Sequence, residues 1–246
     1  MFQQGRYHVR FAQNATDVQA AQELRFRCFR AAGDGPHMGV DQDDFDDKCQ
    51  HVLIEDTRTK RLVCCFRILP IPDGSAINGS YSAQFYELSA LSDFEGAMLE
   101  LGRFCMDPEC RDPNVLRLAW AALTRFVDQE GIQMMFGCAS FEGTEPAAYN
   151  DSFAMLRDRH LAPKRWLPRV KAPTVFRFSL KNKSKPDRVR GLSKMPPLLR
   201  SYLGMGGWVS DHAVVDRDLN TLHVFTGLEI GRIPAARVRL LRALSA

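Results

Sequence analysis

The stretch MLELGRFCMDPECRDPNVLRLAWAALTRFVDQEGIQMMFGC, residues 98–138, decides the fold. Its first nine residues are mostly apolar and predict a strand that ends at Asp107-Pro108. Apolar residues then recur at helical spacing and predict a helix that ends at Gly131. Residues 133–138 predict a second strand. A strand, a proline-containing turn, a helix and a strand in this order indicate an α/β fold.

The remaining chain continues this pattern. Strands are predicted at residues 7–12, 51–55, 62–71, 98–106, 133–138, 174–180, 213–215 and 221–225, and helices at 16–30, 114–130, 145–159 and 198–203. Thr16 is the predicted N-cap of the first helix, and residues 72–96 are predicted to be mostly loop with a short strand or helical turn, of the size of a lid. We expect one mixed central sheet flanked by helices, with a core over 1–182 and a C-terminal elaboration over 183–246 packed on it.

The composition is that of an ordinary globular protein, with 45% hydrophobic and 25% charged residues. No apolar run approaches the roughly 20 residues that span a bilayer, and the N-terminus lacks the apolar stretch of a secretory signal. We therefore expect a cytoplasmic protein. The seven cysteines are scattered and never in C-x-x-C spacing, which favours reduced thiols over disulfides or zinc. No metal site is predicted.

Positive charge is concentrated in one segment. Residues 157–200 contain fourteen Lys or Arg and two acids, whereas the whole chain has a net charge of only +4. A basic surface of this kind suits nucleic acid, anionic lipid or an acidic protein. The segment has no zinc spacing, Gly-rich RNA-binding signature or helix-turn-helix punctuation, so we do not predict nucleic-acid binding.

Charged residues also interrupt apolar elements of the first hundred positions. They are Arg25, the five aspartates between Asp41 and Asp47, Arg67, Glu100 and Arg103. Charges in apolar strands lose hydration, so they are usually paired, metal-bound or catalytic. Simpler interpretations remain: solvated charges at a strand edge, a solvated acidic loop, and structural ion pairs of the arginines. A calcium loop is poorly supported, because the glycine and terminal glutamate of an EF-hand are missing.

The order of elements resembles the GNAT acyltransferase fold. Arg25, the stretch Asp41-Gln42-Asp43-Asp44-Phe45-Asp46, Arg67 and Glu100-x-x-Arg103 resemble the conserved set of the acyl-homoserine-lactone synthases. The wider chain, including residues 136–141, 195–200 and 208–225, is more similar to the bacterial L-ornithine N(alpha)-acyltransferases that make lyso-ornithine lipid. This second resemblance covers nearly the whole chain and implies a GNAT-like core.

The resemblance implies transfer of a 3-hydroxyacyl chain from acyl carrier protein to the α-amine of an amino acid, usually ornithine. An α-ammonium must lose a proton before it attacks a thioester, so a carboxylate is required, and Glu100 is the candidate base. Glu100 and Arg103 are the predicted catalytic residues. In a regular strand their side chains would point to opposite faces, so we expect a bulge at Gly102 that also frees backbone N–H groups for the oxyanion.

The predicted substrate-binding residues are Arg25, Asp41, Asp43, Asp46, Arg67, Phe104, Cys105, Ser140 and Thr144. The two arginines would bind the amino-acid carboxylate or fix the aspartates, and the aspartates would hold an ammonium or fix the arginines. Ser140 and Thr144 would contact the pantetheine amides. Cys138 is not predicted as a nucleophile, because direct transfer needs none.

The acyl donor is predicted from a departure from the GNAT pattern. The expected Gly-rich pyrophosphate loop is replaced by residues 111–116, which lack glycine, and Asp112 would repel pyrophosphate while it caps the helix. This disfavours coenzyme A and favours 3-hydroxyacyl carrier protein, with no bound cofactor. Acyl carrier proteins are acidic, so the basic segment 157–200 is the expected docking surface.

Two further expectations concern the membrane and the acceptor. The basic and apolar residues 232–242 predict peripheral contact with the inner face of an anionic membrane, although a helix docked on the domain fits equally well. The aspartates favour a cationic acceptor such as ornithine, with glutamine or S-adenosylmethionine as alternatives. A non-catalytic carrier-binding or membrane-binding module remains the alternative from another functional class.

Overall fold

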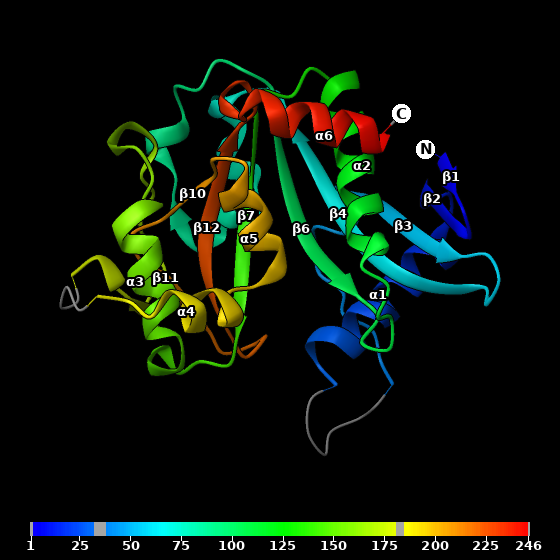
Figure 1. Ribbon diagram of the computed structural model, residues 1–246, viewed down its shortest axis with the longest axis horizontal. Coiled ribbons are helices and arrows are strands. Elements are labelled where there is room, and N and C mark those ends of the chain that lie inside the picture. Colours follow the sequence, from blue (N-terminus) through cyan, green and yellow to red (C-terminus); the bar gives the residue numbers. More distant parts are fainter. Residues whose placement is uncertain (1, 32–37, 181–184, 246) are drawn as a thin grey trace. The chain divides into compact units, whose positions relative to one another are not determined.

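The computed structural model describes residues 2–31, 38–180 and 185–245 (Figure 1). The chain divides into two structural units. The first comprises Met1–Pro70, Leu101–Gly131 and Ala235–Ala246, and the second comprises Ile71–Glu100 and Ile132–Pro234. The domain boundary expected after residue 182 falls within 181–184, outside the described residues, and stays a prediction.

The strands of the first unit follow the order β1-β2-β3-β4-β6. They are β1 (Phe2–Gln4), β2 (Tyr7–Phe11), β3 (Gln50–Asp56), β4 (Arg61–Ile71) and β6 (Met98–Met106), of which Ile71 and the first three residues of β6 belong to the second unit. β1 to β4 pair antiparallel. Val9 lies opposite Ile54, and Val52 lies opposite Phe66. All four are buried, and this burial fixes the register.

Three helices belong to the first unit: α1 (Ala15–Phe29), α2 (Asn114–Gln129) and α6 (Ala235–Ser245). Helix α2 buries an apolar face with helical spacing, formed by Val115, Leu118, Ala119, Ala122 and Phe126. Just past its end, Gly131 has a φ of 62°, the left-handed conformation that glycine adopts without strain. Helix α6 packs across α2 (Figure 1), and Nε and Nη2 of Arg242 each donate to Asp128 at 3.0 Å.

The second unit is built on the pair β7–β12. Its strands follow the order β7-β12-β11-β9, with β10 also paired to β12, and β5 and β8 form a separate two-stranded sheet. The strands are β5 (Tyr86–Glu87), β7 (Met134–Glu142), β8 (Arg169–Val170), β9 (Val175–Phe176), β10 (Trp208–Val209), β11 (Ala213–Asp216) and β12 (Thr221–Glu229). β7 and β12 are antiparallel along their full lengths, from Thr221 opposite Glu142 to Glu229 opposite Met134.

The helices of the second unit are α3 (Asn150–Arg159), α4 (Arg188–Lys194) and α5 (Pro197–Gly204). Short 3-10 helices are η1 (Gly74–Gly79), η2 (Ser82–Gln84), η3 (Ser89–Leu91), η4 (Pro146–Tyr149), η5 (Lys164–Trp166), η6 (Phe178–Leu180) and η7 (Ile230–Arg232). The apolar core of this unit includes Phe141, Phe153, Phe178 and Leu222. Phe153 stacks on Phe178 with ring centroids 5.2 Å apart.

The structure confirms the expected mixed α/β fold and corrects several elements. Helix α1 is capped by Asn14, not Thr16, because the Asn14 side chain accepts a hydrogen bond from the Asp17 amide at 3.0 Å. The strand predicted at 174–180 is only β9, since β9 pairs with β11 at two positions and the chain then coils into η6. Residues 72–96 contain η1, η2, β5 and η3, short elements of the kind predicted within this loop, whereas helix α4, capped by Asp187, was not predicted.

The cap of α1 gives a direct stability test. Asn14→Ala removes the side-chain acceptor of a helix N-terminal amide and should lower the free energy of unfolding by about 1 kcal/mol. Thr16→Ala, two residues further along, is the matched control and should change it by less than about 0.5 kcal/mol. Urea unfolding of both variants measures the difference, and a larger loss for Thr16→Ala would contradict the assignment of the cap.

Candidate functional site

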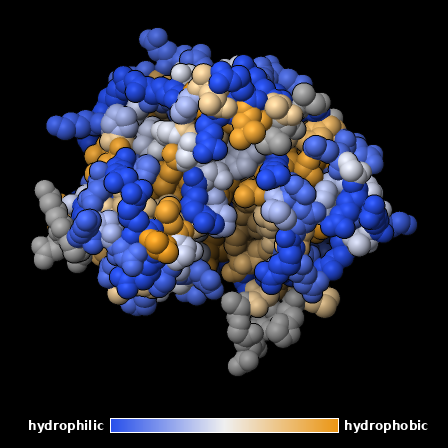
Figure 2. All heavy atoms as spheres, in the orientation of Figure 1, coloured by the Kyte–Doolittle hydropathy of each residue, from blue (hydrophilic) through white to orange (hydrophobic). Residues whose placement is uncertain are grey.

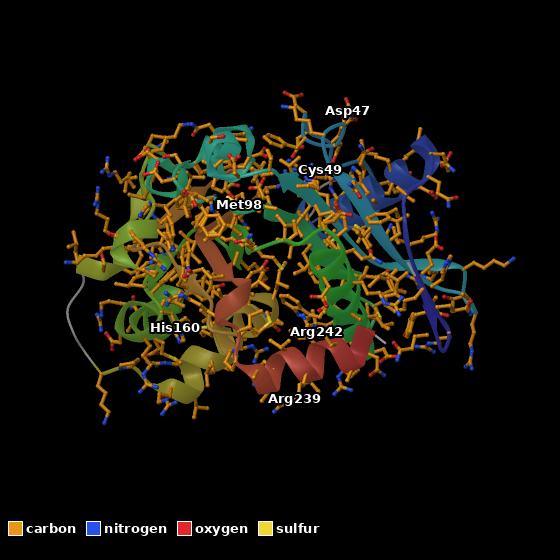
Figure 3. All side chains as sticks on the ribbon, turned by 90° about the horizontal axis from the view of Figure 1, so that it is seen from above. Asp47, Cys49, Met98, His160, Arg239 and Arg242 are labelled. Atoms are coloured by element: carbon orange, nitrogen blue, oxygen red, sulfur yellow. The ribbon has the colours of Figure 1, made fainter. Side chains whose placement is uncertain are left out.

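Seven charged side chains meet in the first unit and form what we call the arginine–aspartate cluster. Its members are Arg25, Arg30, Arg67, Arg103, Asp41, Asp43 and Asp46. The arginines come from α1 and the residue after it, from β4 and from β6. The aspartates come from the segment between α1 and β3, whose last residues include Asp47 and Cys49 (Figure 3).

Arg25 is the most deeply buried arginine of the cluster, with 1% of its side chain exposed. Its Nε donates to Asp41 at 2.9 Å, and its Nη1 donates to Asp46 at 2.6 Å. Arg67 is also buried and donates to both oxygens of Asp43, at 2.6 and 2.7 Å, and to Asp46 at 2.7 Å. Paired donors of this kind fix carboxylates in position and direction.

Arg103 completes the cluster from an irregular point of β6. Its Nε donates to Asp41 and its Nη2 donates to Asp43, both at 3.0 Å. Its φ is 50°, in the left-handed region that a residue with a side chain rarely adopts. This irregular backbone lies next to Gly102, where the bulge is predicted, and the bulge itself stays a prediction. Strain at a non-glycine residue persists only where the surroundings impose it, and here the two aspartates do so.

The charges of the cluster determine the protonation of its acids. Burial alone would raise the pKa of Asp46, but the hydrogen bond and the charge of Arg25 outweigh it and lower the pKa to about 2. The pKa values of Asp41 and Asp43 are lowered despite burial, chiefly by Arg103 and Arg67 respectively. These three carboxylates are ionised at neutral pH and are poor acceptors of a proton.

Glu100 has different partners, within the second unit. One carboxylate oxygen accepts from the Tyr81 amide at 2.8 Å, and the other accepts from the Ser82 amide at 2.7 Å and the Ser82 hydroxyl at 2.6 Å. These donors lie at the beginning of η2. Glu100 is only 4% exposed, so the carboxylate is held in one orientation. The Ser82 hydroxyl also lies 3.5 Å from the thiol of Cys138 on β7.

The segment that holds Glu100 is bound to a basic strand. Tyr86 of β5 pairs with Val170 of β8, and the Ala172 amide donates to the Phe85 carbonyl at 2.9 Å. The ammonium of Lys171 donates to the carbonyl of Ala83 at 2.6 Å. The basic residues near β8 are therefore joined to the backbone next to Ser82.

Comparison with known proteins identifies the family. The model of the acetyltransferase (GNAT) domain matches residues 24–121. An L-ornithine N(alpha)-acyltransferase of Rhodobacter capsulatus is 35% identical over 229 residues, which cover 89% of this chain and 88% of that protein. Another, of Brucella abortus, is 34% identical over 242 residues, 93% of this chain and 86% of that protein. The chain belongs to the L-ornithine N(alpha)-acyltransferase family.

The fold of this acyltransferase is shared with distant relatives. A solved N-acyl amino acid synthase from uncultured soil microbes superposes with a TM-score of 0.55 at 10% sequence identity, over 94% of this chain and 98% of that chain. This likeness supports the GNAT-like fold expected from the sequence.

The acyltransferase brings most of the predicted charged residues together. All six predicted members of the cluster meet there, but Phe104 stacks on Phe66 with centroids 5.5 Å apart, and the Cys105 thiol lies 3.5 Å from that of Cys65. Ser140 is exposed on β7, two residues beyond Cys138 and hence on the same face of the strand. Thr144 lies in the turn that follows β7.

Two sets of hydrogen-bond donors in the acyltransferase were not predicted from the sequence. Arg30 donates to Asp41 at 2.8 Å, and Gln22 donates to Asp46 at 3.0 Å. Their helical positions near Arg25 were the available signal. The Tyr81 and Ser82 amides could not be predicted as donors to Glu100, because any residue except proline supplies a backbone N–H group.

The cluster predicts unequal roles for two arginines of α1. Arg25→Met would leave Asp41 and Asp46 buried with one cation fewer, and should lower the free energy of unfolding by about 3–5 kcal/mol. Arg27→Met is the matched control, because Arg27 is 44% exposed and its contact with Asp107 is 3.6 Å long. The control should lose less than about 1 kcal/mol. Chemical denaturation at neutral pH measures the free energy of unfolding of both variants. Equal losses in the two variants would contradict a structural role of the cluster.

Proposed function

We propose that this chain moves a 3-hydroxyacyl group from acyl carrier protein to the α-amine of L-ornithine, the first step of ornithine-lipid synthesis. Relatedness to L-ornithine N(alpha)-acyltransferases over about nine-tenths of the chain carries the proposal. In the reaction the amine nitrogen bonds to the thioester carbon, the carbon–sulfur bond breaks, and the pantetheine thiol leaves with a proton. Glu100 takes the proton that the α-ammonium must lose, directly or through water.

The structure supports Glu100 as the base through its environment. Its carboxylate is buried, and the Tyr81 amide and the Ser82 amide and hydroxyl orient it by donating hydrogen bonds. The aspartates of the cluster are paired with guanidinium groups and have lowered pKa values. For the oxyanion we propose the backbone N–H groups of Phe104 and Cys105, which follow the break in β6 at Arg103.

The exposed fractions of the charged side chains support a proposal for the acceptor site. Arg25 and Arg67 are too buried to contact a substrate, with 1% and 2% of their side chains exposed, so we infer that they position the aspartates. Asp43 is 23% exposed and is proposed to face the side-chain ammonium of ornithine. Arg103 is proposed to bind the α-carboxylate. Glutamine, which has no side-chain cation, or another amine is the alternative acceptor.

The donor is proposed to arrive on a carrier protein. The Asp112 carboxylate accepts from the Asn114 amide at 2.9 Å and from the Tyr7 hydroxyl at 2.8 Å, so an anion already occupies the N-terminus of α2. This arrangement is unfavourable for pyrophosphate. Lys164, Arg169 and Lys171 are exposed around β8, and we propose that the acidic carrier docks there, close to the backbone that holds Glu100.

Membrane association is proposed because the product is a lipid. None of the helices in the described part of the chain is long and apolar enough to cross a membrane. We therefore propose peripheral contact at the inner face of an anionic membrane. Helix α6, which carries Arg239 and Arg242, packs on α2, so the docked-helix interpretation of residues 232–242 fits the structure (Figure 3).

The reaction and its base are tested together. Purified protein should release thiol from 3-hydroxyacyl carrier protein in the presence of ornithine, faster than with glutamine, and mass spectrometry should find Nα-acylornithine. Glu100→Gln should lower kcat by about 100-fold or more, because the amide cannot accept the proton. No turnover with any amine would favour a non-catalytic module.

A control is needed because the Glu100→Gln amide also disturbs its hydrogen bonds to η2. Ser82→Ala removes one hydroxyl donor but leaves the carboxylate, and should lower kcat by less than about tenfold. If both variants lose activity equally, the effect arises from η2 and not from the base. A near-native rate of Glu100→Gln would remove Glu100 from the mechanism.

The carrier surface is tested by charge reversal. Lys164→Glu with Arg169→Glu should raise the KM for the acyl carrier protein by about tenfold, with little change in the KM for ornithine. Arg58→Glu, an exposed arginine in the turn between β3 and β4, is the matched control and should leave both constants unchanged. Steady-state kinetics at low and high salt measure the effect, and an unaltered carrier KM in the double variant would exclude this surface.

A further inference from the structure

Large apolar side chains are exposed at one place in the second unit. Of the six large hydrophobic residues exposed in the described part of the chain, three fall between residues 180 and 192: Leu180 at 77%, Val189 at 80% and Leu192 at 42%. Val189 and Leu192 are three residues apart on α4 and hence on one side of that helix. Figure 2 shows hydrophobic side chains exposed among hydrophilic ones over this helix.

The opposite side of α4 explains why these residues face outward. Gly191 is buried against α3, where an added Cβ would lie 2.6 Å from the sulfur of Met155. Its carbonyl accepts from the Ser152 hydroxyl at 2.7 Å, and Arg190 forms an ion pair with Asp151. These contacts fix the rotation of α4 and direct Val189 away from the core.

The apolar side chains are surrounded by positive charge. Between residues 185 and 200 the exposed charged residues are Lys185, Asp187, Arg188, Arg190, Lys194 and Arg200, five cations and one anion. Contact with water is unfavourable for the apolar side chains, and the positive charges attract an anionic partner. Both conditions are met together at the interface of an anionic bilayer, where apolar groups enter the acyl boundary and cations meet the headgroups.

We propose that α4 and its basic surroundings are the surface through which the protein docks on an anionic lipid bilayer, with Val189 and Leu192 inserted at the interface. The inference deepens the proposed function, because it rests on a lipid product that must reach a membrane. It transfers the membrane contact from α6 to α4. Within residues 235–243 of α6, whose side chains the structure describes, only Leu240, 52% exposed, is a large exposed hydrophobic residue.

An acidic carrier protein is the competing partner for a basic surface. Positive charge alone is enough to bind such a partner. Lys164, Arg169 and Lys171 supply that charge beside the backbone that holds Glu100. The strongly exposed Val189 has no role in a purely charged contact. The combination of apolar and basic residues on α4 therefore favours the bilayer.

The test uses the full chain and vesicles of phosphatidylcholine with and without phosphatidylglycerol. The wild type should sediment with the anionic vesicles, less at high salt and little with phosphatidylcholine alone. Val189→Ser with Leu192→Ser should weaken this partition by about tenfold at unchanged melting temperature, because both side chains are exposed. Leu240→Ser on α6 and the Lys164→Glu/Arg169→Glu variant are controls, and both should sediment like the wild type.

The outcomes separate this proposal from the proposed function. Vesicle binding needs no turnover, and solution activity with soluble carrier and ornithine needs no vesicles, so each can fail alone. No sedimentation of the wild type, or unaltered sedimentation of the α4 variant, overturns the proposal. A loss with Leu240→Ser would place the contact on α6. A raised KM for carrier protein in the α4 variant, with vesicle binding retained, would assign the surface to the carrier.

Discussion

The ion pairs between buried guanidinium and carboxylate groups are the constraint on which the first unit depends. An unpaired charge inside a protein is destabilising by several kcal/mol, so Arg25 can be buried only where Asp41 and Asp46 receive it. The aspartates lie within residues 38–49, where the Asp41 amide donates to the Gln22 carbonyl at 3.1 Å but no described helix or strand supplies a ladder of backbone hydrogen bonds to fix their place. Their bonds to arginines of α1, β4 and β6 do so instead.

The same bonds explain the backbone of Arg103. A left-handed conformation at a residue with a side chain costs roughly 1–3 kcal/mol and must be imposed by its surroundings. Two charge-assisted hydrogen bonds, to Asp41 and Asp43, offset that cost. In β6 four consecutive buried residues precede three that are partly exposed, and Arg103 is the second of these three. A regular strand could not direct Arg103 to the aspartates and keep its other side chains in the core.

The sequence predicted those parts that depend on local pattern or on charge in an apolar setting. The strand 98–106 was predicted with its observed ends, because Asp107-Pro108 marks its end in the residues themselves. Arg25, Arg67 and Arg103 were recognised because charges are rare in apolar elements. The donors to Glu100 were not, since they belong to Tyr81 and Ser82, which stand 19 and 18 residues before it in the chain. The N-cap of α1 was predicted two residues too late, because Asn14 and Thr16 are both good cap residues and the sequence does not distinguish them.

The carboxylates of the proposed site are held by different elements. Guanidinium groups hold Asp41, Asp43 and Asp46 ionised, and a lowered pKa makes each a weak base at neutral pH. The amides of Tyr81 and Ser82 and the Ser82 hydroxyl donate to the Glu100 carboxylate and fix its orientation beside η2. The proposed transfer to ornithine would use both arrangements. Ionised carboxylates suit the recognition of a cationic acceptor, and an oriented carboxylate suits the removal of a proton, so in the proposed mechanism the two tasks fall on different residues.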